Sequence, residues 1–337
     1  MKNNTRLAFN GYLGQLAKLN GVSVDAVTSK FNATPSVQQK MENKIQESSD
    51  FLKSINVVPV DEQEGEKIGL GLSGPIAGTT DTETKDRETR DVHTTDANRY
   101  RCEQTNYDTH MRYALLDMWA KFPDFQLRLT NQIIQRIALD RIMIGFNGTT
   151  RAPTSNRATN PLLQDVNIGW LQQIRTKAPE RWMKESVAGS GKVVIDPAGD
   201  YKNLDALVYD AVNSLIDPWY QDDTQLVVLT GRKLLSDKYF PLLNDETKPS
   251  EKLAADLIVS QKRLGGHQAV RVPSFPPNAL LITRFDNLSV YFQSGTQRRS
   301  VMDNPKRDRI ENYQSSNDAF VVEDYGCTAL IENIEIV

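Results

Sequence analysis

The chain has 337 residues, of which 39% are apolar and 25% charged, so it can bury a sizeable core in two domains or in one elaborated domain. Forty basic against 43 acidic residues give a net charge of −3, which argues against a dedicated nucleic-acid-binding protein because such proteins carry a basic excess. No segment reaches the ~20 apolar residues of a membrane span, and the two distant cysteines, Cys102 and Cys327, predict reduced structural thiols in cytosol-like conditions.

The first 55 residues are predicted to form a helical N-terminal arm. Apolar residues recur at helical spacing over 5–19, and a weaker helix is expected over 23–30. A third helix opens beside Ser36, which fits a capping box with Gln39, and its apolar face continues to Ile55. Because no strand pattern accompanies these helices, the segment is interpreted as an arm, separate from any sheet.

A literal G-x-G-x-x-G motif occurs at Gly69, Gly71 and Gly74. A dinucleotide site needs this motif to open a helix with an apolar face. Here Pro75 and a long polar segment follow, so no nucleotide site is predicted.

The region around this motif is predicted to be an extended loop at 56–100. The β-branched run at 55–60 predicts a strand, and 67–77 continues as a glycine-spaced extended piece. The tip, 79–96, is charged and almost free of apolar residues, so it cannot bury itself in its own chain and is expected to lie across a neighbouring subunit. The charged residues assigned to this inter-subunit contact are Asp81, Glu83, Lys85, Asp86, Arg87, Glu88, Arg90 and Asp91.

The longest helical period covers 124–146, where Asp124 fits an N-cap and a glycine pair ends the pattern. Arg136 and Asp140 are spaced for a surface ion pair. Arg141 lies near the apolar stripe, so the stripe is either interrupted there or meets an acidic partner from elsewhere. The residues predicted to form the apolar face are Leu127, Ile133, Ile134, Ile137, Ala138, Ile142 and Ile144.

The second half of the chain alternates helix and strand. After a helix within 166–183 and a Gly/Ser loop at 185–199, which is the best internal boundary, an amphipathic helix is predicted at 204–216. Strands at 226–231 and 268–273 flank helices from Arg232 and over 251–260, which indicates an α/β subdomain. The remaining apolar runs predict an antiparallel sheet that closes the chain; they are ALLITRF, NLSVYFQ, DAFVVEDYG and ALIENIEIV.

No catalytic motif is present: the chain lacks HExxH, GxSxG, a CxxC pair, an EF-hand loop and a phosphate loop, including at Gly191-Lys192. His93, His110 and His267 are scattered and read as loop or structural residues, so no enzyme activity, cofactor or metal site is predicted. The densest basic set is interleaved with acids and predicts a solvated or subunit-facing salt-bridge surface rather than a nucleic-acid groove; it comprises Arg298, Arg299, Lys306, Arg307 and Arg309.

Long stretches of the sequence resemble the major capsid proteins of P2-like tailed phages. They cover nearly the whole chain and include QESSDFLKSINVVPV, GEKIGLGLSGPIAGTTDT, DFQLRLTNQIIQRIALDRIMIGFNG, NPLLQDVNIGWLQ, DPWYQDD, DKYFPLLN, LAADLIVSQKRLG, AVRVPSFP and ENYQSSNDAFVVEDY. The resemblance implies the α+β HK97-like capsid fold. Its parts would be an arm at 1–55, an extended β-loop at 56–100, a peripheral domain at 101–200 with the long spine helix and return strands at 276–337, and an α/β axial domain at 201–275.

The resemblance also implies a function, namely self-assembly into an icosahedral capsid that encloses double-stranded DNA. The expected partners are other copies in pentamers and hexamers, a scaffold, a prohead protease, a portal protein, decoration or size-determination proteins, and DNA bound without sequence specificity. Assembly would occur in the bacterial cytoplasm and the product would be the virion capsid. An encapsulin-like compartment on the same fold is the nearest alternative, and an enzyme is a more distant one.

The resemblance further implies that a prohead protease trims the arm. Matching by position places the cut near Lys30, Phe31 or Asn32, so about 1–31 would be lost. The apolar face of 5–19 must meet something, and a scaffold or an arm from another subunit is expected there rather than this chain's own core.

Overall fold

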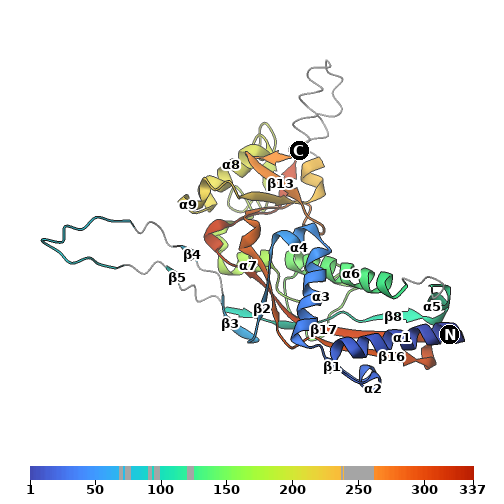
Figure 1. Ribbon diagram of the computed structural model, residues 1–337. Helices are drawn as coiled ribbons and strands as arrows, with labels where there is room; N and C mark the ends of the chain where they lie inside the picture. The colour runs from blue at the N-terminus through green and yellow to red at the C-terminus, as the bar shows by residue number, and fades with distance from the viewer. Residues whose placement is uncertain are drawn as a thin grey trace, which may run out of the picture. The chain divides into compact units, whose positions relative to one another are not determined.

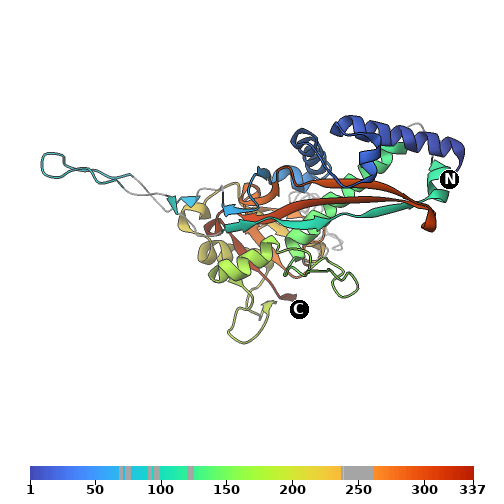
Figure 2. The ribbon, with the colours of Figure 1, turned by 90° about the horizontal axis from the view of Figure 1, so that it is seen from below.

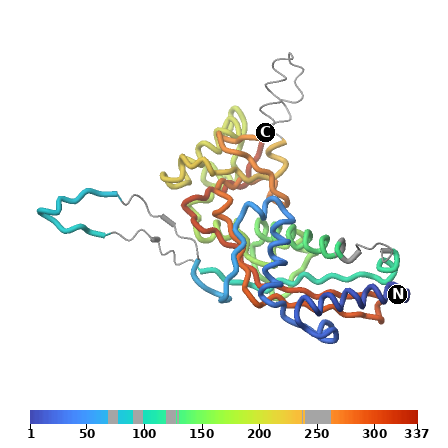
Figure 3. Tube along the Cα trace, in the orientation of Figure 1, coloured from blue at the N-terminus to red at the C-terminus, as the bar shows by residue number. Residues whose placement is uncertain are grey.

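The computed structural model describes residues 1–67, 71–72, 77–89, 93–94, 99–119, 125–236, 238 and 262–337 (Figure 1, Figure 3). The chain divides into two compact units, each assembled from separate stretches of sequence. The first contains Met1–Glu64, Arg101–Gly169 and Ser289–Phe320, and the second contains Gly65–Tyr100, Trp170–Leu288 and Val321–Val337. Within the described ranges, no helix has the length and apolar character needed to cross a bilayer.

The first unit is built on a seven-stranded sheet (Figure 2). Its path is β1-β16-β17-β15-β2, and β7 and β8 pair with β17 off this path. All the registers given for it are antiparallel except that of β15 with β2, which is parallel. The strands are β1 (Phe31–Asn32), β2 (Asn56–Val60), β7 (Glu103–Asn106), β8 (Thr109–Arg112), β15 (Leu288–Gln293), β16 (Arg298–Asn304) and β17 (Arg309–Val322).

The arm helices of this unit are α1 (Asn3–Asn20), α2 (Val24–Thr28), α3 (Pro35–Glu47) and α4 (Asp50–Ser54). The predicted capping box at the start of α3 is wrong: Thr34 is the N-cap without a side-chain capping bond, the Ser36 hydroxyl lies 3.4 Å from the Thr34 hydroxyl, and Gln39 bonds forward to Asn43 at 2.9 Å. Pro35 in the first turn starts the helix instead, since its fixed φ suits that position. The predicted continuous face also breaks, because α3 ends before α4 begins.

The spine helix is α6 (Phe125–Asn147), preceded by α5 (Tyr113–Trp119). The predicted pair of Arg136 with Asp140 is present at 2.6 Å, and the proposed cap, Asp124, lies outside the described residues. Leu127 was expected on the buried face, but it is 57% exposed because it lies near the helix start. The rest of the predicted face is partly or fully buried; its buried members are Ile134, Ile137, Ala138, Ile142 and Ile144.

The second unit contains a six-stranded sheet in the order β12-β13-β11-β14-β18-β9. Pairing is parallel for β11 with β13 and for β18 with β9, and antiparallel elsewhere. The predicted helix at 204–216 is confirmed as α8, and its apolar side packs in the core of this unit. The elements are β9 (Trp182–Met183), β11 (Val227–Thr230), β12 (Arg263–Leu264), β13 (His267–Arg271), β14 (Leu280–Thr283), β18 (Ala329–Ile331), α7 (Trp170–Lys177), α8 (Leu204–Leu215) and α9 (Pro218–Gln221).

The prediction of one closing antiparallel sheet is wrong. The last strands are divided among three sheets, since β15 and β17 join the first unit's sheet while β14 and β18 join the second unit's. A third, two-stranded sheet pairs β10 (Val193–Ile195) in parallel with β19 (Ile334–Ile336). Strands such as β14 are buried on both faces, so their sequence shows an apolar run without indicating a partner.

Short strands border the extended loop. β4 (Gly71–Leu72) pairs antiparallel with β5 (His93–Thr94), as expected for a two-stranded excursion. β3 (Glu64–Glu66) pairs with β6 (Arg99–Arg101). The predicted helix at 251–260 lies outside the described residues.

Candidate functional site: ion cluster, arm and loop

Among the described residues, no group of three or more His, Cys, Asp or Glu is placed to hold a metal ion. Cys102 and Cys327 are free and buried, which confirms the expected structural thiols. Burial is the main cause that raises the pKa of each thiol to about 12. Burial also lowers the pKa of His267, whereas His110 lies exposed on β8.

We therefore expect both thiols to resist alkylation in the folded chain. Thiolate is the reactive form, and a pKa near 12 leaves very little of it at pH 8. Labelling with iodoacetamide, followed by mass spectrometry, should be at least about a hundredfold slower in buffer than in urea. Rapid native labelling of either cysteine would contradict this burial.

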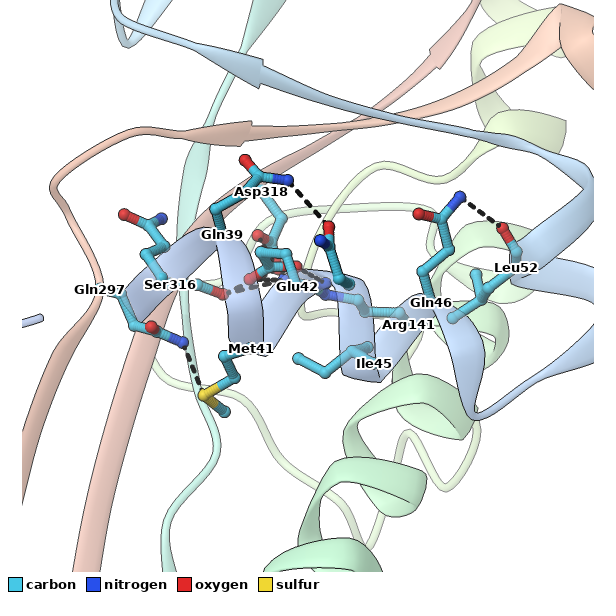
Figure 4. Close-up of polar contacts among 12 residues, drawn as sticks. Gln39, Met41, Glu42, Ile45, Gln46, Leu52, Arg141, Gln297, Ser316 and Asp318 are labelled. Carbon is cyan, nitrogen blue, oxygen red and sulfur yellow. Dashed lines mark hydrogen bonds and ion pairs between the residues drawn. The ribbon is translucent and has the colours of Figure 1, made fainter. Parts of the chain in front are cut away.

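A buried, densely connected polar site of the first unit is centred on Arg141 of α6 (Figure 4). Its guanidinium is 2% exposed and lies between Glu42 of α3 and Asp318 of β17, both 1% exposed. Nη1 and Nη2 donate to the two carboxylate oxygens of Glu42, and Nη2 and Nε donate to those of Asp318 at 3.0 and 3.2 Å. The hydroxyls of Tyr107 and Ser316 also reach Asp318 Oδ2, at 3.1 and 3.0 Å.

The electrostatics of this cluster follow from its burial and its charge count. Burial opposes the charge of Arg141, but attraction by Asp318 and Glu42 outweighs it and raises the arginine's pKa well above its ordinary value. Two carboxylates share this one cation. Burial raises the pKa of Glu42, against the lowering effect of Arg141. Burial likewise raises the pKa of the Tyr107 hydroxyl, which stays protonated and able to donate.

Of the two interpretations that the sequence allowed for Arg141, the acidic partner from elsewhere is correct. Neither acidic partner was predicted from the sequence. A partial signal existed for Glu42, because it precedes the apolar Ile45 by three residues on α3 and so borders the predicted apolar face; the structure shows it buried there with Gln38 and Ile45. A carboxylate on a buried helical face needs a cation, and Arg141 is the cation on an apolar face elsewhere. Asp318 gives no such signal in the sequence.

The apolar face of α1 packs against its own chain, so the expectation that only a scaffold or another subunit would cover it is wrong. Leu13 and Leu16 lie in one cluster with Val301 of β16 and Ile310 of β17. The physical reason is β16, a strand whose sequence was predicted only as part of a basic surface. The arm is further fixed by an ion pair from Arg6 to Asp303 at 2.6 Å.

The residues predicted near the processing site lie next to or within a paired strand. Lys30 is exposed, whereas Phe31 is buried and pairs with Arg299 across β1 and β16. Asn32 is exposed and pairs with Arg298, and Ala33 N donates to Gln297 O at 2.9 Å. Cleavage between Lys30 and Phe31 therefore requires β1 to separate locally from β16.

The described tip of the extended loop is fully solvated. All residues of 77–89 are exposed, and the hydrogen bonds given for them remain within 81–85, around Asp81. Of the predicted inter-subunit residues, Arg90 and Asp91 lie outside the described residues. The other six are exposed; they are Asp81, Glu83, Lys85, Asp86, Arg87 and Glu88.

One residue of the basic set at 298–309 forms the predicted kind of salt bridge. Arg309 pairs with Glu311 at 2.5 Å on β17. Lys306 and Arg307 are exposed in the turn between β16 and β17.

Comparison with known proteins identifies the family. A model described as "Phage major capsid protein, P2 family" matches residues 8–334. The "Capsid proteins" of Escherichia phage P2 are 52% identical over 342 residues, covering 100% of this chain and 96% of that one. The "Major capsid protein" of Serratia phage KSP20 is 44% identical, covering 99% and 97%.

Solved structures agree with this result. A chain of a satellite phage P4 procapsid that includes size determination protein is 49% identical, with a TM-score of 0.84 and coverage of 100% of this chain and 99% of that one. A capsid of an empty GTA particle, at 15% identity and a TM-score of 0.51, covers 86% of this chain and 90% of that one and shows the fold alone. The predicted α+β HK97-like capsid fold is thereby confirmed, and the relatives are structural proteins rather than enzymes. The chain belongs to the P2 family of phage major capsid proteins.

Proposed function

We propose that this capsid protein assembles through rings of five and six copies into an icosahedral shell that encloses double-stranded DNA. One chain must then occupy slightly different environments in the shell, and its most solvated segment can change conformation most easily to fit them. The single observation that supports this assignment, beyond the family, is the described loop tip. Its residues 79–89 are charged or polar and exposed, and their described hydrogen bonds lie within 81–85, so they are available to a neighbouring copy.

The assignment of structural domains along the chain is part of the same proposal. Residues 1–55 act as the arm, 56–100 as the extended loop, 101–200 with 276–337 as the peripheral domain, and 201–275 as the axial domain. The Arg141 cluster supports this division, because it bonds the end of the arm to the spine helix and to a return strand. The arm would thus be anchored at α3 even when its earlier residues are released.

The partners are assigned by chemistry and by the relatives. The P4 procapsid structure includes a size determination protein, which supports a comparable partner for this chain. A scaffold, a prohead protease and a portal protein complete the proposed set, and assembly takes place in the bacterial cytoplasm. DNA would be enclosed without sequence-specific contacts, in keeping with a net charge of −3.

Expression of the chain with its scaffold and protease tests this proposal. Electron microscopy of the purified product should show closed shells with five-fold vertices. Monomers alone, or an open filament, would contradict the assignment.

We further propose that the arm is trimmed near Lys30, Phe31 or Asn32. The exposed Lys30 and the short length of β1 support this position, since only two strand residues must separate. Intact-mass measurement of the chain from DNA-filled particles should show a loss of about 30 N-terminal residues. A mass that begins at Met1 or Lys2 would refute the trimming.

A further inference from the structure

The second unit carries two surfaces that the preceding assignments leave without a function. The first, here called the aromatic–acidic patch, consists of Tyr209, Asp210, Trp219 and Asp222 on and beside α8 and α9. The side chain of Tyr209 is 68% exposed and that of Trp219 is 48% exposed. Tyrosine and tryptophan are enriched at the centres of protein interfaces, where they bury large areas at low entropic cost.

The aromatic–acidic patch is held in a fixed shape. Asn213 Nδ2 donates to Tyr209 O at 2.7 Å, and Gln221 Nε2 donates to Asn213 O at 3.0 Å and to Ile216 O at 2.8 Å. These bonds connect α9 to the end of α8, whose opposite side is buried in the core. The backbone that carries the patch therefore loses little further conformational entropy on binding.

The second surface, here called the basic hollow, has a volume of about 700 Å³. No acidic side chain occurs among its described lining residues, and within the described ranges neither Arg232 nor Arg271 forms an ion pair. Lys233 Nζ lies 3.4 Å from Asn278 Oδ1. The polar and proline residues that line the hollow are Arg232, Lys233, Ser236, Arg271, Pro273, Ser274 and Pro277.

Topology places the two surfaces at opposite ends of one sheet. α9 precedes the amino end of β11, whereas Arg232 follows its carboxyl end. β13 runs parallel to β11 and brings Arg271 to the same carboxyl end. In Figure 1, α9 lies at the left of this unit and β13 to its right.

We propose that the aromatic–acidic patch of one copy docks into the basic hollow of the next copy in the same ring. This inference rests on the proposed assembly, because a head-to-tail ring requires two different, complementary surfaces on each subunit. Asp210 and Asp222 would meet Arg232 and Arg271, and the exposed rings would lie against guanidinium groups. A contact of this kind closes into rings when its rotation fits five or six copies.

A DNA phosphate is the other anion that the basic hollow would attract. DNA leaves the two exposed aromatic rings of the patch unexplained, whereas a second copy engages both surfaces. The two possibilities predict different results when the charges are exchanged.

The test uses three charge variants of the full chain, each produced with the scaffold. The hollow variant carries Arg232→Glu and Arg271→Glu, the patch variant carries Asp210→Lys and Asp222→Lys, and the combined variant carries all four changes. Each single-surface variant should lose closed particles at least about tenfold, because every ring contact then opposes like charges. The combined variant should recover them, which also shows that the changed residues are compatible with folding.

Mixing the hollow and patch variants provides a control based on parity. Alternation restores opposite charges at every contact of a six-membered ring. A five-membered ring cannot alternate and must keep at least one like-charge contact. The mixture should therefore give hexamers, as open sheets or tubes, without closed shells. Trp219→Ala, at an exposed site, should also reduce particle yield.

The outcomes separate this inference from the proposed function. If the unaltered chain forms shells and the single-surface variants form them equally well, the docking contact is refuted while the shell assignment stands. If the single-surface variants form no closed particles and the combined variant folds but also forms none, the docking contact is refuted. If the combined variant has in addition lost its bound DNA, the result favours binding of a DNA phosphate in the basic hollow. If the unaltered chain forms no shells, the proposed function fails first.

Discussion

Replacing Arg141 with alanine is expected to destabilise the first unit by about 3–5 kcal/mol, because it leaves two buried carboxylates without their cation. Such a loss approaches the whole stability of many domains. Urea unfolding of the unassembled chain, followed by far-ultraviolet circular dichroism, measures the change, because three of the four tryptophans lie in the second unit and do not report on the first. We expect the unfolding transition of the first unit to shift to a lower urea concentration, and we expect particle assembly to fail.

Two conservative variants serve as controls for this prediction. Arg141→Lys keeps the charge but loses the planar fork that bonds Glu42 and Asp318 at once, so its cost should be intermediate. Glu42→Gln keeps the shape and removes one of the two negative charges, so its cost should be the smallest of the three. A stability of Arg141→Ala equal to that of the unaltered chain would contradict the role of the cluster.

The cluster also predicts a dependence on pH. Burial raises the pKa of Glu42 above its ordinary value of 4.5. A carboxyl with a raised folded pKa contributes stability below its unfolded pKa and loses that contribution as pH rises through the folded pKa. The stability of the unaltered chain relative to Glu42→Gln should therefore fall as pH increases from 4.5 toward neutrality. A relative rise over this range would show that the arginine outweighs burial.

Sequence reasoning succeeded where one element determines its own pattern. The period of α8 and the buried face of α6 are properties of single segments, and both were found. The resemblance supplied the fold and the family, because it rests on long matching stretches rather than on short motifs. The pairing of the strands was predicted wrongly, because β14 and β15 both appear in the sequence as apolar runs although they lie in different sheets.

The same limit applies to the candidate sites. Glu42, Arg141 and Asp318 are far apart in the chain, and no spacing rule joins them. The contact made by the apolar face of α1 was missed because β16 has only two apolar residues, Val301 and Met302, within a charged stretch, so the buried Val301 was not recognised as a partner. The exposed loop tip needed no partner to be recognised, since its composition alone excludes burial.

Deletion of residues 79–96 is expected to abolish stable shells while leaving the subunit folded. Residues 79–89 of this segment are exposed, and their described hydrogen bonds lie within 81–85. His93–Thr94 form β5, which pairs with β4 in a two-stranded sheet of the loop itself, so the deletion removes this short pairing and no strand of the six- and seven-stranded sheets. The change in unfolding free energy should stay within about 1 kcal/mol, the scale of loop-length and surface effects. Urea unfolding of the monomer and electron microscopy of the assembly products measure the two effects on one preparation.

A matched control replaces 79–96 with a Gly/Ser segment of equal length. This variant keeps the reach of the loop and removes its side chains, so it should also fail to give stable shells if charged side chains make the contact with the next copy. Recovery of shells by the Gly/Ser variant would instead mean that only chain length matters. A large fall in monomer stability after deletion would overturn the inter-subunit role, because it would place the loop in the chain's own core.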